Sequence, residues 1–193
     1  GAAQFRNHEG KIVTSSELTD EDMTDIGSAI PKFTYGITLN LEYKGFDFTA
    51  FGTGVAGNKI FNILYRADSP LRNSLKYYMD NAWTPENKGA SMPAVNNVAT
   101  DLNFWSSSAA MFNGSYFKIK QLQLGYTLPK RLTQKVAIKD LRFFVSLDDF
   151  FTFSNYPGMD PETATTGNNG GAGFDIGSYP TMKKCSFGAS FSF

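Results

Sequence analysis

Apolar and polar residues alternate along several stretches of this chain. In residues 33–43 every odd-numbered position is Phe, Tyr, Ile or Leu, and every even-numbered position is Thr, Gly, Asn or Glu. The final stretch, 185–193, reads Cys-Ser-Phe-Gly-Ala-Ser-Phe-Ser-Phe and has the same period. A period of two predicts a strand with one apolar face and one wet face. Such strands suit either a half-buried soluble sheet or a membrane barrel with lipid outside and a polar lumen inside.

Three further strands are indicated by the same pattern. The five expected strands span residues 33–43, 46–55, 116–128, 141–153 and 185–193. Lys44-Gly45 predicts a tight turn, so the first two strands should form a hairpin. The alternation slips near Ala50-Phe51, where we expect a β-bulge, and near Lys120-Gln121, where a bulge would restore a single apolar face. The predicted fold class is therefore all-β and antiparallel.

The connections between these strands alternate in length. They are the Lys44-Gly45 turn, residues 57–115, residues 130–138 and residues 156–181. Short and long connections thus fall at opposite ends of the sheet, which is typical of transmembrane barrels, and compact soluble domains rarely contain a loop as long as 57–115. Five strands would leave two open edges, and single-chain bacterial barrels have an even number of strands. We therefore expect the C-terminal segment of a larger transmembrane β-barrel, preceded by a loop at 1–32.

The composition is consistent with a chain of many strands and does not support several other classes of protein. The 193 residues carry a formal net charge of +0, so electrostatics do not point to nucleic acid. Aromatic residues make up 15% of the chain and there are 18 glycines, which suits strands and turns better than helices. The single cysteine, Cys185, falls on the apolar phase of its strand, where it should behave as a small hydrophobic residue.

The candidate chemistry is sparse. His8 is the only histidine and has no neighbouring nucleophile, so it gives no catalytic constellation. The adjacent carboxylates of Asp148-Asp149 should point to opposite faces of a strand and cannot act as a pair on a glycosidic bond. A calcium-loop register with Gly10 at its sixth position would put Phe5 at the first ligand position and Ser16 at the twelfth. We therefore expect no enzyme activity, no metal and no cofactor.

Blocks of the sequence resemble, in family order, the SusC/RagA-type TonB-linked outer-membrane transporters of Bacteroidetes. The blocks are Asp25–Gly36, Leu39–Phe48, Trp83–Asn87, Gly114–Lys120, Leu122–Pro129, Phe150–Phe153, Gly158–Glu162, Gly177–Pro180 and the terminal Phe193. They cover most of the chain, and they are specific as a set although each alone would be weak.

The resemblance implies a 22-stranded barrel in the outer membrane, plugged by an N-terminal domain and covered by a SusD-like lipoprotein. It implies uptake of oligosaccharides or peptides, energised through TonB. This chain resembles only the last five strands, so its partners would be the rest of its own barrel and plug, outer-membrane lipid and the SusD-like protein. Residues 1–32, 57–115 and 156–181 would lie outside the cell. The terminal aromatic, Phe193, would serve as a barrel-assembly signal at the periplasmic rim.

Aromatic residues gather in the longest of the expected loops. They are Tyr77, Tyr78, Trp83, Phe104 and Trp105. Aromatic side chains can stack on sugar rings or anchor a partner protein, although packing within the loop is the plainer interpretation of each one. These five are our candidate ligand or lid contacts. The side chains expected in the lumen are Thr38, Asn40, Lys118, Lys120, Gln121 and Arg142.

A different class of protein also produces alternating strands. The alternative is a soluble or surface-exposed β-sheet module that binds carbohydrate. Its sheet would need a second layer to cover the apolar face, and the sequence offers no second set of inward-facing strands. The pattern therefore favours the barrel.

Overall fold

The computed structural model describes residues 1–62, 75–94, 102–133, 138–166 and 171–193, which form two compact units. The sheet unit comprises 32–56, 115–154 and 180–193, and the loop unit comprises 1–31, 57–114 and 155–179. Parts of the predicted connections 57–115, 130–138 and 156–181 thus lie outside the described residues.

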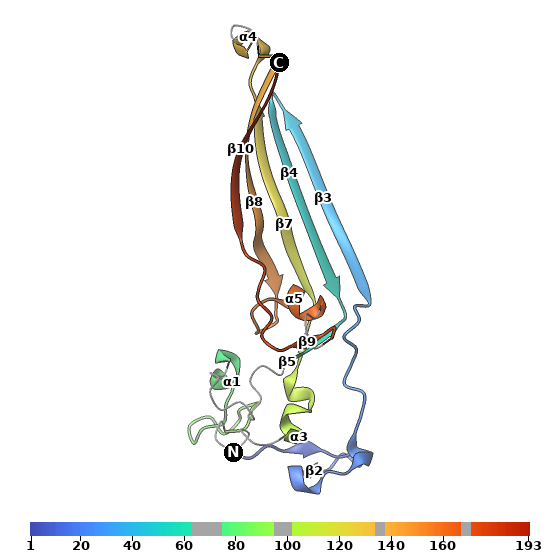
Figure 1. Cartoon of the computed structure of the whole chain (residues 1–193). Helices are drawn as coiled ribbons and strands as arrows, with labels where there is room; N and C mark the ends of the chain where they lie inside the picture. The colour runs from blue at the N-terminus through green and yellow to red at the C-terminus, as the bar shows by residue number, and fades with distance from the viewer. Residues whose placement is uncertain (63–74, 95–101, 134–137, 167–170) are drawn as a thin grey trace. The chain divides into compact units, whose positions relative to one another are not determined.

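Five long strands form the sheet unit. They lie in the order β10-β8-β7-β4-β3, with every neighbouring pair antiparallel (Figure 1). Their bounds are β3 Phe33–Tyr43, β4 Phe46–Ala56, β7 Tyr116–Thr127, β8 Asp140–Ser154 and β10 Lys184–Ser192. A short helix, α4 (Lys130–Thr133), begins the connection from β7 to β8. Each of the five predicted strands is present to within a residue at either end, which confirms the fold class.

The β3–β4 hairpin closes through the predicted turn. Lys44 and Gly45 both have positive φ, 47° and 87°, and Tyr43 pairs directly with Phe46. Two consecutive residues with positive φ define a type I′ turn, whose twist matches that of the flanking strands. Glycine supplies one of these conformations without a steric cost. This turn fixes the register, and the pairing then runs without a break to Phe33 and Ala56.

The two faces of the sheet differ in chemistry, because directly opposed residues share a face. The large side chains of what we call the apolar face are Phe33, Tyr35, Ile37, Leu39, Leu41, Tyr43, Phe46, Phe48, Phe117, Ile119, Leu122, Leu124, Tyr126, Phe143, Val145, Leu147, Phe151, Phe153, Phe187 and Phe191. Many of them are exposed: Phe33 by 62%, Phe153 by 59% and Phe187 by 82%. The opposite, polar face carries mainly Thr, Ser, Asn, Gln and charged residues.

A bulge keeps the apolar face continuous along β7. The β4–β7 register shifts between Phe51 and Gly52, where Lys120 is the extra residue on β7. Between the same flanking pairs β8 has two residues, Asp149 and Phe150, where β7 has one, and Asp149 has φ 57°. The predicted bulge near Lys120 is confirmed. The irregularity expected near Phe51 occurs at that place, but β4 itself stays regular against β3 and the extra residues belong to β7 and β8.

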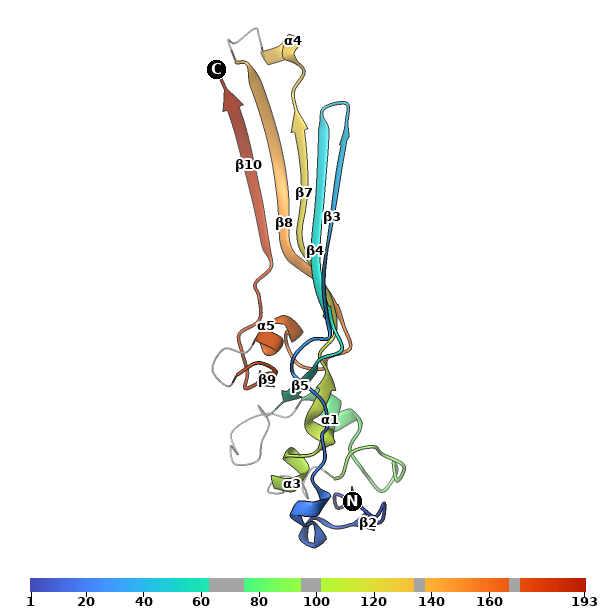
Figure 2. The ribbon, with the colours of Figure 1, turned by 90° about the vertical axis from the view of Figure 1, so that its right-hand side faces the viewer.

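The loop unit contains short elements. Its strands are β1 Phe5–Arg6, β2 Ile12–Val13, β5 Lys59–Asn62, β6 Met111–Asn113 and β9 Phe174–Asp175. Its helices are α1 Lys76–Asp80, α3 Leu102–Trp105 and α5 Pro161–Thr166, with 3₁₀ turns η1 Ser15–Glu17, η2 Asp20–Asp22 and η3 Ser108–Ala110. β1 pairs with β2, and β5 lies between β6, antiparallel, and β9, parallel. Figure 2 labels β2, β5, β9, α1, α3 and α5 of this unit in a second view.

Two apolar clusters hold the loop unit together. One is built from Ala3, Tyr78, Met92, Phe104, Trp105 and Ala110, and the other from Ile60, Tyr156 and Ala164. The ring of Phe112 on β6 packs against both clusters. The connections that the sequence pattern left unstructured therefore have a core of their own.

Candidate functional site

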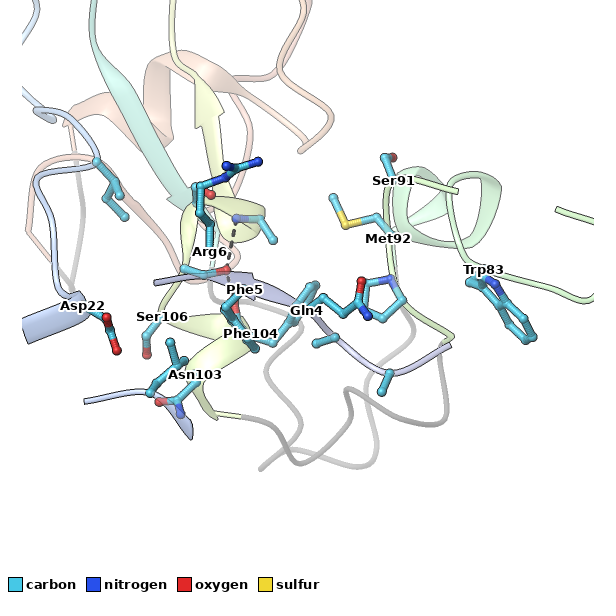
Figure 3. A pocket seen from close by; sticks show the side chains of 18 of the residues that line it. Gln4, Phe5, Arg6, Asp22, Trp83, Ser91, Met92, Asn103, Phe104 and Ser106 are labelled. Carbon is cyan, nitrogen blue, oxygen red and sulfur yellow. Dashed lines mark hydrogen bonds between the residues drawn. The ribbon is translucent and has the colours of Figure 1, made fainter. Parts of the chain in front are cut away.

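An open cavity of about 1130 Å³ lies in the loop unit (Figure 3). Its walls come from the chain start at 1–6, the η2 region at 18–26, the segment 83–93 and the α3–η3 region at 103–109. Three of these four segments are held together by the first apolar cluster, since Ala3, Met92 and Phe104 belong to both the cluster and the cavity wall. The cavity is therefore shaped by packing between segments far apart in the sequence.

The cavity wall mixes polar and apolar side chains and carries few charges. Its charged side chains are Arg6, Asp22 and Lys88, and the Arg6 guanidinium already donates to the carbonyl of Gly10, with Nη1 at 3.3 Å. The uncharged polar residues are Gln4, Thr19, Thr24, Ser91, Asn103, Ser106, Ser107 and Ser108. In Figure 3 the side chains of Gln4 and Phe104 lie on the same side of the view, and Trp83 lies apart from them, beyond Met92. Amides and hydroxyls beside aromatic rings can hydrogen-bond and stack on a neutral polar ligand.

Asp22 fastens one wall of the cavity. Its carboxylate accepts from the backbone N–H of His8 at 2.9 Å, the backbone N–H of Thr19 at 2.8 Å and the His8 ring Nδ1 at 2.7 Å. The hydrogen bonds from His8 and Thr19 favour the charged form and hold the pKa of Asp22 well below its usual range. Thr19 also caps η2. Asp22 thus ties the β1–β2 hairpin to the turn that follows it.

The five candidate aromatic residues lie in different surroundings. Tyr78, Phe104 and Trp105 are buried, with edge-to-face ring contacts at 5.4 Å between Tyr78 and Trp105 and 5.1 Å between Phe104 and Trp105. Tyr77 is half-buried and packs edge-on against Tyr78 at 5.7 Å. Of the five, Phe104 and Trp83 line the cavity and the other three do not. Trp83 is half-buried. Packing within the loop unit therefore accounts for Tyr78 and Trp105.

A buried polar cluster was missed by the sequence reasoning. The Tyr156 hydroxyl donates to the Asp175 carboxylate and accepts from the Asn62 amide, whose Nδ2 lies 2.9 Å away. Burial, followed by the contact with Asp175, raises the pKa of Tyr156 well above its usual value. The cluster joins β5, β9 and the segment after β8. The short alternation in 59–62 could have marked this strand, but nothing local predicts its partners.

The polar face carries ion pairs across the sheet. Arg142 on β8 holds Asp47 on β4 through two contacts, Nε to Oδ2 at 2.8 Å and Nη2 to Oδ1 at 2.5 Å. The intervening residue of β7 is Gly125, where a Cβ would come within 2.4 Å of both partners. The absence of a side chain at Gly125 therefore lets the pair span three strands.

Most of the residues expected in the lumen lie on the polar face. Thr38, Asn40, Lys118, Gln121 and Arg142 share it according to the strand register. Lys118 is buried and donates to Thr181 Oγ1 at 2.6 Å. Lys120 is the bulge residue, and its Nζ lies 2.6 Å from Asp149 Oδ1. Asp148 lies on the polar face and accepts from Ser146, so the adjacent carboxylates are separated by the bulge rather than by simple alternation.

The residues singled out near the chain end lie where the alternation predicts. Cys185 is opposite Leu147 on the apolar face and is exposed. Phe193 follows β10, is 86% exposed and meets Phe191 edge-on with 5.6 Å between ring centroids. Within the described ranges, no group of three or more His, Cys, Asp or Glu side chains is arranged to hold a metal ion. None of the helices described here has the length and hydrophobicity needed to cross a bilayer.

Nearly the whole length of this chain is similar in sequence to part of two known proteins. TonB-dependent receptor P3 of Formosa agariphila is 33% identical over 187 residues, which is 93% of this chain and 18% of that receptor. TonB-dependent receptor P26 of the same organism is 25% identical over 199 residues, 100% of this chain and 20% of the receptor. No family model matches the chain. The chain thus spans about a fifth of the length of the curated relatives it matches.

Solved structures share the fold. The RagAB peptide importer in its open-open state matches with a TM-score of 0.75 and 23% identity, covering 100% of this chain and 21% of that one. The closed-closed state of the same importer matches with a TM-score of 0.72 and 24% identity over 97% of this chain and 20% of that one. The five-stranded sheet with its exposed apolar face is thus the fold of part of a much larger chain. Over nearly its whole length, this chain is therefore similar in sequence to a segment of TonB-dependent receptors, and its sheet has the fold of a segment of the RagAB importer.

Proposed function

We propose that this chain is the C-terminal part of the barrel of a transporter that takes up oligosaccharides across the outer membrane, energised through TonB. The observation that carries the proposal is the sheet with two unlike faces. Its apolar face exposes Phe33, Phe153 and Phe187 by more than half of their surface, whereas its polar face holds ion pairs and hydroxyls. Lipid outside and a wet lumen inside supply the two surroundings that these faces require.

The loop unit belongs outside the cell in this proposal. The β3–β4 turn and the α4 connection lie at the end of the sheet where the short connections occur, and short turns face the periplasm in such barrels. Residues 1–32, 57–115 and 156–181 then form extracellular loops around the ligand chamber. The terminal aromatic, Phe193, would stand at the periplasmic rim, where we propose that it serves as an assembly signal.

The chemistry of the cavity favours a neutral sugar ligand over a peptide. Hydroxyl and amide side chains outnumber charged ones along its wall, and two of its charged side chains, Arg6 and Asp22, are already engaged within the loop unit. Trp83 offers a half-buried indole for stacking. The likeness to a peptide importer supports a peptide as the second candidate substrate. A SusD-like lipoprotein over these loops is the proposed partner.

A soluble carbohydrate-binding module remains the alternative from another class. It would have to cover the apolar face with a second layer. Among the described residues, the face carries exposed Phe, Leu and Ile side chains along β3, β7, β8 and β10. The likeness to receptors of about five times this length also counts against a self-contained module.

Binding of sugar by the complete receptor tests the proposed substrate. Purified receptor in detergent is titrated calorimetrically with neutral oligosaccharides and, separately, with mixed peptides. Trp83→Ala should weaken sugar binding by roughly fivefold or more, which corresponds to about 1 kcal/mol for a contact aromatic. Tyr179→Ala is the matched control, because Tyr179 is a loop-unit aromatic that is 74% exposed and does not line the cavity. Binding of peptides alone, or equal effects of both substitutions, would overturn the substrate assignment.

A further inference from the structure

Four cationic side chains lie at the end of the sheet where the short connections occur. They are Lys44 in the β3–β4 turn, Lys130 and Arg131 in α4, and Lys139 directly before β8, and all four are exposed. Figure 1 shows the β3–β4 turn and α4 at the same end of the sheet. Within the part of the chain that the structure describes, none of these four side chains forms an ion pair. We call the four residues the basic rim.

The acidic side chains at this end belong to the polar face. Asp47 is held there by Arg142 through two hydrogen bonds. Glu42 lies directly opposite Asp47, and Asp140 lies directly opposite Ser192, so the strand register puts both on the polar face as well. Among the described residues, the apolar side of this end therefore carries positive charge without carboxylates.

A row of aromatic rings crosses the apolar face just inside the basic rim. It comprises four directly opposed residues on neighbouring strands, Tyr43, Phe46, Tyr126 and Phe143. The ring centroids of Phe46 and Tyr126 are 4.5 Å apart. The ammonium of Lys44 lies 5.1 Å from the ring centroid of Tyr43, which places this cation on the apolar side of the sheet. Because aromatic side chains gather where acyl chains meet headgroups, the basic rim lies at the depth of the headgroups.

The α4 segment combines basic and apolar side chains. Lys130 and Arg131 are followed by Leu132, a large apolar residue that is 49% exposed. Segments of this kind settle at the boundary between headgroups and acyl chains, and they bind anionic lipids more strongly than neutral ones. An acidic soluble partner would neutralise the cations, but it would leave Leu132 and the aromatic row uncovered. An anionic lipid supplies both the negative charge and the apolar cover.

We propose that the basic rim and the aromatic row bind anionic glycerophospholipids of the leaflet that the short connections face. The inference rests on the proposed function, in which lipid covers the apolar face and these connections face the periplasm. The lipid phosphate pairs with the ammonium and guanidinium groups, while the acyl chains lie along the apolar face beyond the aromatic row. Each cation beside an anionic lipid surface adds about fivefold to the affinity, which corresponds to about 1 kcal/mol.

Photocross-linking in the complete receptor tests this proposal. Benzoylphenylalanine replaces Leu132 in receptor held in nanodiscs with equal amounts of dioleoylphosphatidylglycerol and dioleoylphosphatidylcholine. After irradiation, lipid adducts on the peptide that contains position 132 are counted by mass spectrometry. Phosphatidylglycerol adducts should outnumber phosphatidylcholine adducts by about fivefold or more, and about 0.5 M salt should reduce this ratio. Equal adducts of the two lipids, or adducts with protein alone, would overturn the proposal.

Two double substitutions separate a local effect from an effect of net charge. Lys130→Gln with Arg131→Gln should lower the ratio of lipid adducts at position 132 by roughly fivefold or more. Lys32→Gln with Lys184→Gln is the matched control, because these exposed lysines stand where β3 and β10 begin, at the opposite end of the sheet. The control should leave the ratio unchanged, and an equal decrease in both double variants would contradict a lipid site at the basic rim.

A second photoreporter separates failure of this inference from failure of the proposed function. Benzoylphenylalanine at position 39 replaces Leu39, which lies on the apolar face in the middle of β3. Lipid adducts at position 39 together with equal adducts of the two lipids at position 132 would overturn only the preference for anionic headgroups. The absence of lipid adducts at both positions would overturn the proposed barrel as well.

Discussion

At the scale of single residues, the loop unit depends on a few buried polar side chains. Tyr156 is 7% exposed, and its hydroxyl serves two partners, Asn62 and Asp175, that are themselves buried. Removing one partner of a buried hydrogen bond leaves the others unsatisfied, which typically costs about 1–3 kcal/mol. Tyr156 is therefore the single side chain whose hydroxyl should matter most to the order of these loops.

Tyr156→Phe should make the loop unit open more readily. The substitution keeps the ring but leaves the Asp175 carboxylate and the Asn62 amide without their shared partner, so we expect a loss of roughly 1–3 kcal/mol in local stability. Protease cleavage of the loops in the complete receptor measures this. Tyr179→Phe, at an exposed position, is the control. Unchanged cleavage of Tyr156→Phe would show that the hydroxyl contributes nothing.

Tyr156 also predicts that the stability of the loop unit falls at alkaline pH. The pKa of Tyr156 is raised in the folded state by burial and by Asp175. A raised folded pKa means that the folded state holds the proton more tightly, so stability is intact below the unfolded pKa of about 10 and falls as pH rises above it. Loop cleavage in the unaltered receptor should therefore increase above about pH 10. Tyr156→Phe should lack this component, and an identical alkaline increase in both proteins would contradict the assignment.

Asp22 predicts that the attachment of the β1–β2 hairpin to the cavity wall weakens at acid pH. Hydrogen bonds from His8 and Thr19 lower its folded pKa, so its contribution is present above the unfolded pKa of about 3.9 and is lost as pH falls through the lower folded value. The β1–β2 hairpin should loosen from the cavity wall in strong acid. Hydrogen exchange of residues 5–13 measures this, and Asp22→Asn should show the loosened hairpin already at neutral pH. Equal protection from hydrogen exchange in the unaltered receptor and in Asp22→Asn at all pH values would contradict this role of Asp22.

At the scale of elements, the two faces of a strand predict opposite tolerances to charge. Leu39 and Thr38 are neighbours at the middle of β3, on the apolar and polar faces. Leu39→Arg puts a guanidinium against lipid and should cost about 2–4 kcal/mol, whereas Thr38→Arg puts it in the lumen and should cost little. The yield of folded, heat-modifiable receptor in the outer membrane compares them. Equal tolerance of both substitutions would contradict the assignment of the faces.

Gly125 makes a second prediction at this scale. In Gly125→Ala the new methyl group would lie within 2.4 Å of Asp47 and Arg142, so the pair that crosses β7 must move. The pair is partly solvated, with about a quarter of each side chain exposed, and its loss should cost no more than about 1 kcal/mol. Gly36→Ala is the matched control, because its methyl group meets nothing closer than 3.7 Å. Thermal unfolding should separate the two variants, and equal midpoints would contradict this view of Gly125.

The elements also show how far the sequence could predict the fold. β3 and β4 follow from local alternation and from Lys44-Gly45, because a period of two and a type I′ turn are encoded by adjacent residues. The pair of Asp47 with Arg142 could not be predicted, since the partners are 95 positions apart and meet only through the register of three strands. The short helix α5 (Pro161–Thr166) was also missed, although Asp160 accepts from the N–H of Glu162 at its start.

The candidate site was less accessible to sequence reasoning. The cluster of aromatics was visible in the sequence, but burial decides the surroundings of each ring, and burial depends on contacts between distant segments. Tyr78 and Trp105 pack into the core of the loop unit, whereas Trp83 reaches the cavity wall. The Tyr156 cluster has no local signature, because its three members come from three separate elements.

At the scale of the whole molecule, we propose that this sheet is one part of a closed barrel in the outer membrane. Its edge strands, β3 and β10, each pair on one side only within the described residues, and its apolar face is uncovered. Both features are resolved when neighbouring strands continue the sheet and lipid covers the face. The chain's share of its relatives' length leaves room for those strands.

The most direct measurement is gel migration of native outer-membrane material, boiled and unboiled, with detection of a peptide from this chain. We predict that the peptide is found in one large species, which migrates differently before and after boiling because a closed barrel resists unfolding by detergent. Detection of the chain as a monomer of about 21.3 kDa in plain buffer, without heat-dependent migration, would contradict the assignment to a barrel. The soluble carbohydrate-binding module would then be the favoured interpretation.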